Sequence, residues 1–84
     1  PLSHSLAWTL EGERPEERVH VLANAWWRQL EFELPPLPVN LGWHRVLDTS
    51  LPSPRDIVAL EEAEAVPGQR YRAGWHSVVA LRPR

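Results

Sequence analysis

Acidic side chains are the groups in this sequence that could do acid–base chemistry. Hydrolysis of a glycosidic bond needs two carboxyl groups roughly 5–10 Å apart. Glu31 and Glu33 would lie about 7 Å apart on the same face of a strand. Neighbouring like charges on a solvated face also keep an edge strand from unwanted pairing. We therefore assign this pair to a solvated surface and predict no catalytic residue in the chain.

The histidines show no spacing that is typical of a metal site. A zinc site needs three or four ligands that converge on one ion, and cysteine, the other common zinc ligand, is absent from the sequence. We predict structural or surface roles for the histidines, and we predict neither a metal nor a cofactor. The four histidines are His4, His20, His44 and His76.

The five tryptophans raise the remaining functional question. Trp8 alternates with Leu6 and Leu10, which predicts a core position. Trp26 and Trp27 are consecutive, so they should point to opposite faces of a strand, and one of them should be exposed where the chain reverses. An exposed indole could stack on a sugar or fill a pocket on another domain, and we favour packing. The candidate carbohydrate contacts are Trp26, Trp27, Trp43 and Trp75.

Short strands are the elements that must position these side chains. Apolar and polar residues alternate with period two, β-branched residues are frequent, and Gly and Pro separate the segments. Ser53 followed by proline indicates a short helical turn, with irregular chain up to Gln69. Asn24 and Asp48 are typical turn formers at strand ends. The expected strands cover residues 5–10, 18–24, 30–34, 42–48, 71–72 and 77–81.

These patterns predict an all-β fold, a small antiparallel β-sandwich of six to eight strands. Eighty-four residues suffice for one domain, residues 1–84, with a small core. The net charge is −2 and the nine arginines are scattered among eleven acids, which argues against a nucleic-acid partner. No run of apolar residues is long enough for a membrane span. The absence of cysteine favours a cytoplasmic location.

Three blocks of residues form an ordered series along the chain. Residues 24–36 have the pattern N-A-x-x-x-x-L-x-F-x-L-P, and residues 43–57 have the pattern W-x-R-V-L-D-T-S-x-P-S-P-x-D-I. Tyr71-Arg72 and then Ser77-Val-Val-Ala-Leu81 complete the series. In this order the blocks resemble the C-terminal region of isoamylase-type glycogen debranching enzymes. The aromatic run Gly74-Trp75-His76 departs from the family pattern.

The resemblance implies a domain like the C-terminal domain of the α-amylase superfamily. In that family a catalytic (β/α)₈ barrel in the same polypeptide hydrolyses α-1,6 branch linkages in glycogen-like glucans and holds the catalytic acids. None of the barrel motifs occurs here, so no catalytic residue is carried over.

Three functions remain open. The chain could be a structural domain that packs on the barrel, or a binding module that holds glycogen or malto-oligosaccharide through exposed tryptophans. A self-contained enzyme is the weakest alternative. An apolar patch rimmed by charge would favour packing, and two or more tryptophans presented together would favour binding.

Overall fold

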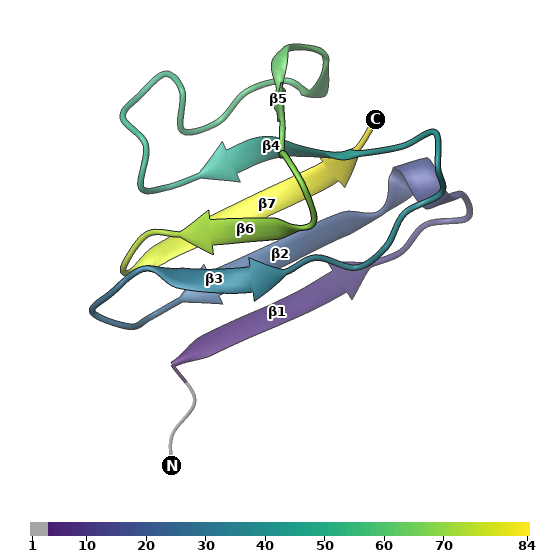
Figure 1. Cartoon of the computed structure of the whole chain (residues 1–84). Helices are drawn as coiled ribbons and strands as arrows, with labels where there is room; N and C mark the ends of the chain where they lie inside the picture. The colour runs from purple at the N-terminus through teal and green to yellow at the C-terminus, as the bar shows by residue number, and fades with distance from the viewer. Residues whose placement is uncertain (1–3) are drawn as a thin grey trace.

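The computed structural model describes residues 4–84, and these residues form two antiparallel sheets (Figure 1). Two single 3-10 turns, Pro15–Glu17 and Leu60–Glu62, are the only helical elements of this part of the chain. The seven strands are β1 (Ser5–Leu10), β2 (Val19–Asn24), β3 (Leu30–Glu33), β4 (Trp43–Asp48), β5 (Glu64–Ala65), β6 (Arg70–Ala73) and β7 (Ser77–Pro83). The predicted all-β class and strand number are therefore confirmed.

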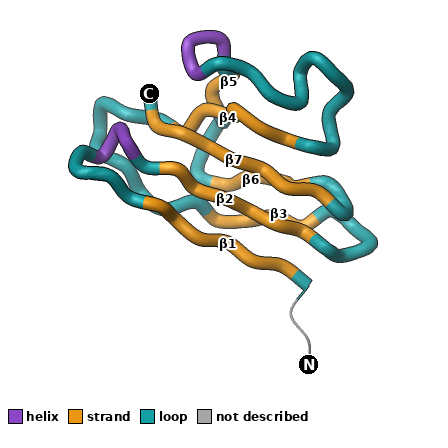
Figure 2. Tube along the Cα trace, turned by 180° about the vertical axis from the view of Figure 1, so that it is seen from behind, coloured by secondary structure: helices purple, strands orange, loops and turns teal. Residues whose placement is uncertain are grey.

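The larger sheet has the strand order β1-β2-β7-β4-β5, and the smaller sheet pairs β3 with β6. The last long strand, β7, lies between β2 and β4, so the end of the chain joins the two halves of the large sheet. Figures 1 and 2, which view the molecule from opposite sides, show that the small sheet lies over β2 and β7. This arrangement is a small β-sandwich with one sheet much narrower than the other.

The segment after Ser53 differs from the expected helical turn. The chain turns there without forming a helix, and Ile57 makes an isolated antiparallel bridge to Leu47 of β4. The helical turn lies later, at Leu60–Glu62, and β5 follows it. No helix forms after the predicted N-cap because the backbone of this segment makes hydrogen bonds with β4 instead. The Asp48 N–H donates to the Asp56 carbonyl, and the Val58 N–H donates to the Val46 carbonyl.

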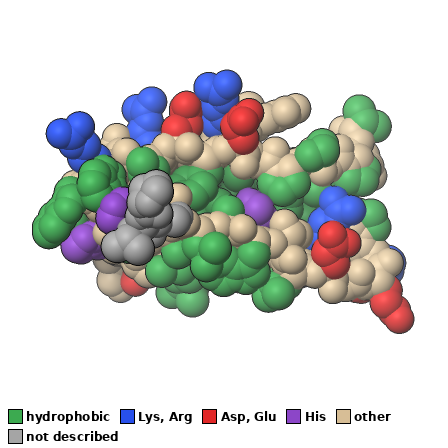
Figure 3. Space-filling model, turned by 90° about the horizontal axis from the view of Figure 1, so that it is seen from below, with side chains coloured by type: hydrophobic (Ala, Val, Ile, Leu, Met, Phe, Trp, Pro, Cys, Tyr) green, Lys and Arg blue, Asp and Glu red, His purple; other side chains and the backbone are tan. Residues whose placement is uncertain are grey.

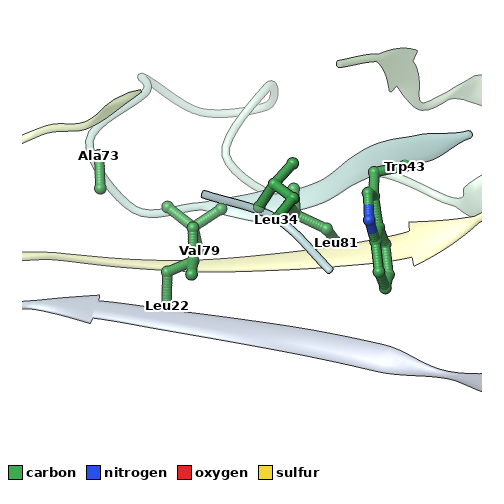
Figure 4. Close-up of a cluster of buried hydrophobic side chains, with 6 residues drawn as sticks. All are labelled: Leu22, Leu34, Trp43, Ala73, Val79 and Leu81. Atoms are coloured by element: carbon green, nitrogen blue, oxygen red, sulfur yellow. The ribbon is translucent and has the colours of Figure 1, made fainter. Parts of the chain in front are cut away.

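The core lies between the two sheets (Figure 4). Leu22 of β2 and Val79 and Leu81 of β7 are fully buried, and burying each such side chain contributes about 1.5–3 kcal/mol. The ring of Trp43, at the start of β4, closes one end of this cluster, and its exposed fraction is only 5%. The buried hydrophobic residues are Leu22, Leu34, Trp43, Ala73, Val79 and Leu81.

Trp8 is not a core residue, and this corrects the prediction from alternation. The exposed fraction is 39% for Trp8, 61% for Leu6 and 57% for Leu10. The strand and its alternation are as predicted, but the face that carries Leu6, Trp8 and Leu10 is exposed and not buried. Thr9 points inward, because it lies opposite the buried His20 and contacts its ring. The small sheet does not reach β1, so it does not cover the apolar face of this strand, which stays exposed.

The buried imidazole of His20 makes stability depend on pH. Its exposed fraction is 5%, its Nδ1 lies 2.7 Å from the Thr9 hydroxyl, and its Nε2 has no hydrogen-bond partner among the described residues. Burial lowers the pKa of His20 below its ordinary value of 6.5 because a charged ring would lose its hydration. Below pH 6.5 the unfolded chain therefore binds a proton that the folded chain does not bind, and stability falls.

We expect the free energy of unfolding to decrease as the pH is lowered from 7.5 to 5.5. His20→Gln keeps a polar partner for Thr9 but does not titrate, so the decrease should be smaller in that variant. Urea unfolding at several pH values measures the free energy of unfolding of the wild type and of the variant. Most carboxylates titrate below pH 5.5, so they contribute little to the change in this range. An equal decrease in wild type and variant would show that His20 is not responsible.

Candidate functional site

The loops at one end of the sandwich are held together by the side chain of Asn24, which is 2% exposed. Its amide nitrogen donates to the carbonyls of Arg28 (2.9 Å), Ala73 (3.2 Å) and Gly74 (3.0 Å). Its amide oxygen accepts from the backbone N–H of Trp26 at 2.9 Å. The predicted turn-forming role is confirmed, but Asn24 also joins the β2–β3 loop to the β6–β7 loop, two segments far apart in the sequence.

These two loops bring Trp27 and Trp75 together around His76. The imidazole centroid of His76 lies 5.5 Å from the Trp27 ring and 5.1 Å from the Trp75 ring, with tilts of 40° and 47°. The indoles are 71% and 61% exposed. His76 has a φ of 49°, in the left-handed region that few residues adopt, and its N–H donates to the Trp26 carbonyl at 3.3 Å. The result is an exposed aromatic cluster, which we define as Trp27, His76 and Trp75.

Trp26 and Trp43, the other two candidate carbohydrate contacts, lie elsewhere. Trp26 is partly buried, and its ring lies 4.1 Å from that of His4. Trp43 belongs to the core, where its Nε1 donates to the carbonyl of Pro35 at 2.9 Å. A buried indole offers no face to a sugar, so the structure leaves Trp27 and Trp75 as the aromatic pair open to a ligand.

The outer face of the large sheet carries a second exposed group of apolar side chains. Residues directly opposite one another in a sheet share a face, and one such row crosses the sheet from β1 to the bridge beside β4. Leu6 and Leu10 flank this row on β1, and Val78 on β7 is 40% exposed. The row consists of Trp8, Val21, Ala80, Leu47 and Ile57.

The opposite side of the sandwich is charged. On the small sheet Glu31 and Glu33 are exposed, as predicted, and they lie opposite Arg72 and Arg70 in the strand register. The carboxylate of Glu31 lies 3.3 Å from the guanidinium of Arg70. Figure 3 shows a row of charged side chains along one edge of the molecule and a group of hydrophobic side chains near the opposite edge, with further charged side chains at one end. The two outer faces are thus chemically different.

Asp48 is buried, but its carboxylate is committed to structural hydrogen bonds. It accepts from the backbone N–H of Ser50 at 2.9 Å and from the Ser50 hydroxyl at 2.6 Å, which is the predicted Asx turn. It also accepts from the Tyr71 hydroxyl. Burial, and then the hydrogen bond to Asp48, raises the pKa of Tyr71 well above its usual value. The hydrogen bonds of both side chains stabilise the fold.

A hollow of about 410 Å³ lies between residues 35–43 and residues 66–69. Proline, leucine and valine side chains and the edge of Trp43 form most of its walls, together with Gln69. The side chains named in this lining include no acid, base or nucleophile. The hollow therefore offers no group for chemistry.

The sequence is similar to known proteins over nearly its whole length. A model of the family described as "Isoamylase, C-terminal" matches residues 1–82. The protein "Isoamylase 3, chloroplastic" from Oryza sativa subsp. japonica is 33% identical over 84 residues, which cover 98% of this chain and 10% of the rice protein. No solved structure matches the chain.

The rice relative overturns the expectation of a cytoplasmic location, because its name places it in the chloroplast. The expectation rested on the absence of cysteine, which indicates only that no disulfide is needed and does not distinguish one reducing compartment from another. Within residues 4–84 there is no helix with the length and hydrophobicity required to cross a membrane.

Sequence and structure agree on the class of domain. The three sequence blocks run from Asn24, the last residue of β2, to Leu81 in β7. They contain the turn residues Asn24 and Asp48, which bond as their positions predict. The family match extends over nearly the whole chain, and the rice protein is similar over the same length. The chain belongs to the isoamylase C-terminal domain family.

Proposed function

We propose that the chain is a non-catalytic domain of a glycogen-debranching enzyme and that it packs against the catalytic (β/α)₈ barrel of the same polypeptide. The barrel would hydrolyse α-1,6 branch linkages, and this domain would cover one side of it. The observation that carries the proposal is the apolar row on the outer face of the large sheet. The chain spans about a tenth of the length of the rice relative, so most of that relative lies outside the matched region.

The outer face has the chemistry of an interface. Trp8 lies at its edge with Leu6 and Leu10 on either side, and exposed apolar groups of this size on one face commonly mark a contact surface. A solvated outer face would instead alternate polar residues with the buried ones, as the small sheet does with Glu31 and Glu33. Tryptophan is also the side chain most enriched among the residues that dominate interface energies.

The small size of the domain supports the same function. A chain of this length buries only a little over about 60% of the surface that its unfolded form exposes, so its own core supplies a narrow margin of stability. Covering the outer face would remove further apolar surface from water, at about 25 cal/mol per Å². Packing would therefore stabilise both the domain and the protein that carries it.

The test compares Trp8→Ala in two contexts, the 84-residue chain and the full polypeptide that contains it. In the 84-residue chain Trp8 is exposed, so the loss of unfolding free energy should be below about 1 kcal/mol. In the full polypeptide the same change should cost about 2–4 kcal/mol, the range of a dominant interface residue. Denaturant unfolding followed by circular dichroism and by residual debranching activity measures both.

Trp27→Ala is the matched control, because it also removes an exposed indole but lies outside the outer face. It should leave the stability of the full polypeptide within about 0.5 kcal/mol of wild type. If Trp8→Ala has the same small effect in both contexts, the outer face is solvated in the full protein and the packing function is excluded.

A further inference from the structure

We infer that the aromatic cluster of Trp27, His76 and Trp75 is a surface binding site for an α-glucan chain. This inference rests on the proposed function for the identity of the sugar, since the polymer would be the substrate of the debranching barrel. The site takes no part in bond cleavage. Its role is to hold a segment of the polymer and so raise the local concentration of branch points near the barrel.

The first argument is the exposure of two large aromatic rings at one place. The indoles of Trp27 and Trp75 are 71% and 61% exposed, although burying one such ring would remove about 150–250 Å² from water. A glucose ring presents an apolar face of C–H groups with hydroxyl groups around its rim. An indole matches this pattern, with an apolar face for stacking and one N–H donor at its edge.

The second argument is spacing. Both indoles contact the imidazole of His76, with centroid distances of 5.5 Å for Trp27 and 5.1 Å for Trp75. Because both indoles contact the same imidazole, they lie close enough to each other to bind one short segment of chain. His76 contacts both indoles and adds ring nitrogens that can bond to sugar hydroxyl groups.

The third argument is that the site is rigid before any ligand arrives. Asn24 is 2% exposed and bonds to the backbone of both loops, and the His76 N–H bonds across to the Trp26 carbonyl. The backbone of His76 is held in the left-handed region, and its ring contacts both indoles. The entropy lost when loops become ordered is a main free-energy cost of binding. These loops are already ordered by the fold, so this cost is small here.

The cluster is distinct from the outer face that we assign to packing. Trp27 and Trp75 project from the loops beyond β2 and β6, whereas Trp8 and its neighbours lie within the large sheet. The run Gly74-Trp75-His76 is also the place where the sequence departs from the family pattern. The domain can therefore pack through its sheet and bind glucan through its loops at the same time.

Affinity electrophoresis of the 84-residue chain in gels that contain glycogen tests the site without the barrel. We expect glycogen to retard the wild-type chain, and we expect Trp27→Ala and Trp75→Ala each to weaken the apparent affinity about fivefold or more, as loss of one stacking ring does elsewhere. His76→Asn tolerates the same backbone conformation but lacks the ring, and it should also weaken retardation. Trp8→Ala is the matched control and should migrate as wild type does.

Titration with maltoheptaose, followed by tryptophan fluorescence, gives a second readout, and circular dichroism shows that each variant is folded. Cello-oligosaccharide, with the same sugar in a different linkage, should bind more weakly.

Absence of retardation, or retardation that none of the three cluster variants reduces, would show that the cluster is not a glucan-binding site. A loss of stability of the full polypeptide in Trp27→Ala or Trp75→Ala, without any glycogen binding, would assign the cluster to an interface instead. The Trp8→Ala stability test is independent of these results, so the packing function and the binding site can fail separately.

Discussion

Replacing Trp43 with alanine will lower the free energy of unfolding of the 84-residue chain by about 3–5 kcal/mol, the range for emptying a large aromatic site in a core. The indole is 5% exposed, packs beside the ring of His20 at 5.6 Å and donates its N–H to the Pro35 carbonyl. The change therefore removes a packed ring and leaves a partly buried carbonyl without its donor. An 84-residue domain holds only about 4–13 kcal/mol in total.

Urea unfolding monitored by far-ultraviolet circular dichroism measures this loss. Trp75→Ala is the control, because it removes the same side chain from a site that is 61% exposed, and it should change stability by less than about 1 kcal/mol. A loss below about 1 kcal/mol for Trp43→Ala would mean that the ring does not close the core as the structure indicates.

Asn24→Ala will destabilise the chain by about 2–4 kcal/mol. The side chain makes hydrogen bonds to the carbonyls of Ala73, Gly74 and Arg28 and to the N–H of Trp26. Alanine replaces none of them, and each buried group left without a partner costs about 1–3 kcal/mol unless water reaches it. The two loops should then separate, so the near-ultraviolet dichroism of the tryptophans should decrease as well.

The matched control is Asn40→Ala, which removes an exposed asparagine from the loop between β3 and β4. Its effect on the unfolding free energy should be within about 0.5 kcal/mol. If Asn24→Ala is equally mild and keeps the near-ultraviolet signal, the loops are held by other contacts and the rigidity of the aromatic cluster has a different origin.

Much of the fold follows from local patterns in the sequence. Alternation of apolar and polar residues identified β1 and β3, and β-branched residues identified β2. The roles of Asn24 and Asp48 were also predictable, because a short amide or carboxylate side chain bonds to backbone two residues ahead wherever a turn begins. These features depend on neighbours along the chain, which a sequence shows directly.

The face of each strand that is buried was decided by tertiary structure. Alternation assigns Leu6, Trp8 and Leu10 to one face of β1, but it is equally consistent with burial or exposure of that face. The small sheet covers β2 and β7 and stops short of β1, so the apolar face of this edge strand stays outside.

The proximity of Trp27 and Trp75, which both contact His76, could not be predicted from the sequence either. The alternation rule concerns neighbouring residues, and it led us to separate Trp26 from Trp27 without supplying a partner for either. The partner comes from a distant loop, because β6 and β7 return the chain to the end of β2 and Asn24 bonds the two loops there. Strands and turns are thus set by interactions within a few residues, whereas the outer apolar face and the aromatic cluster depend on contacts between segments that only the folded chain brings together.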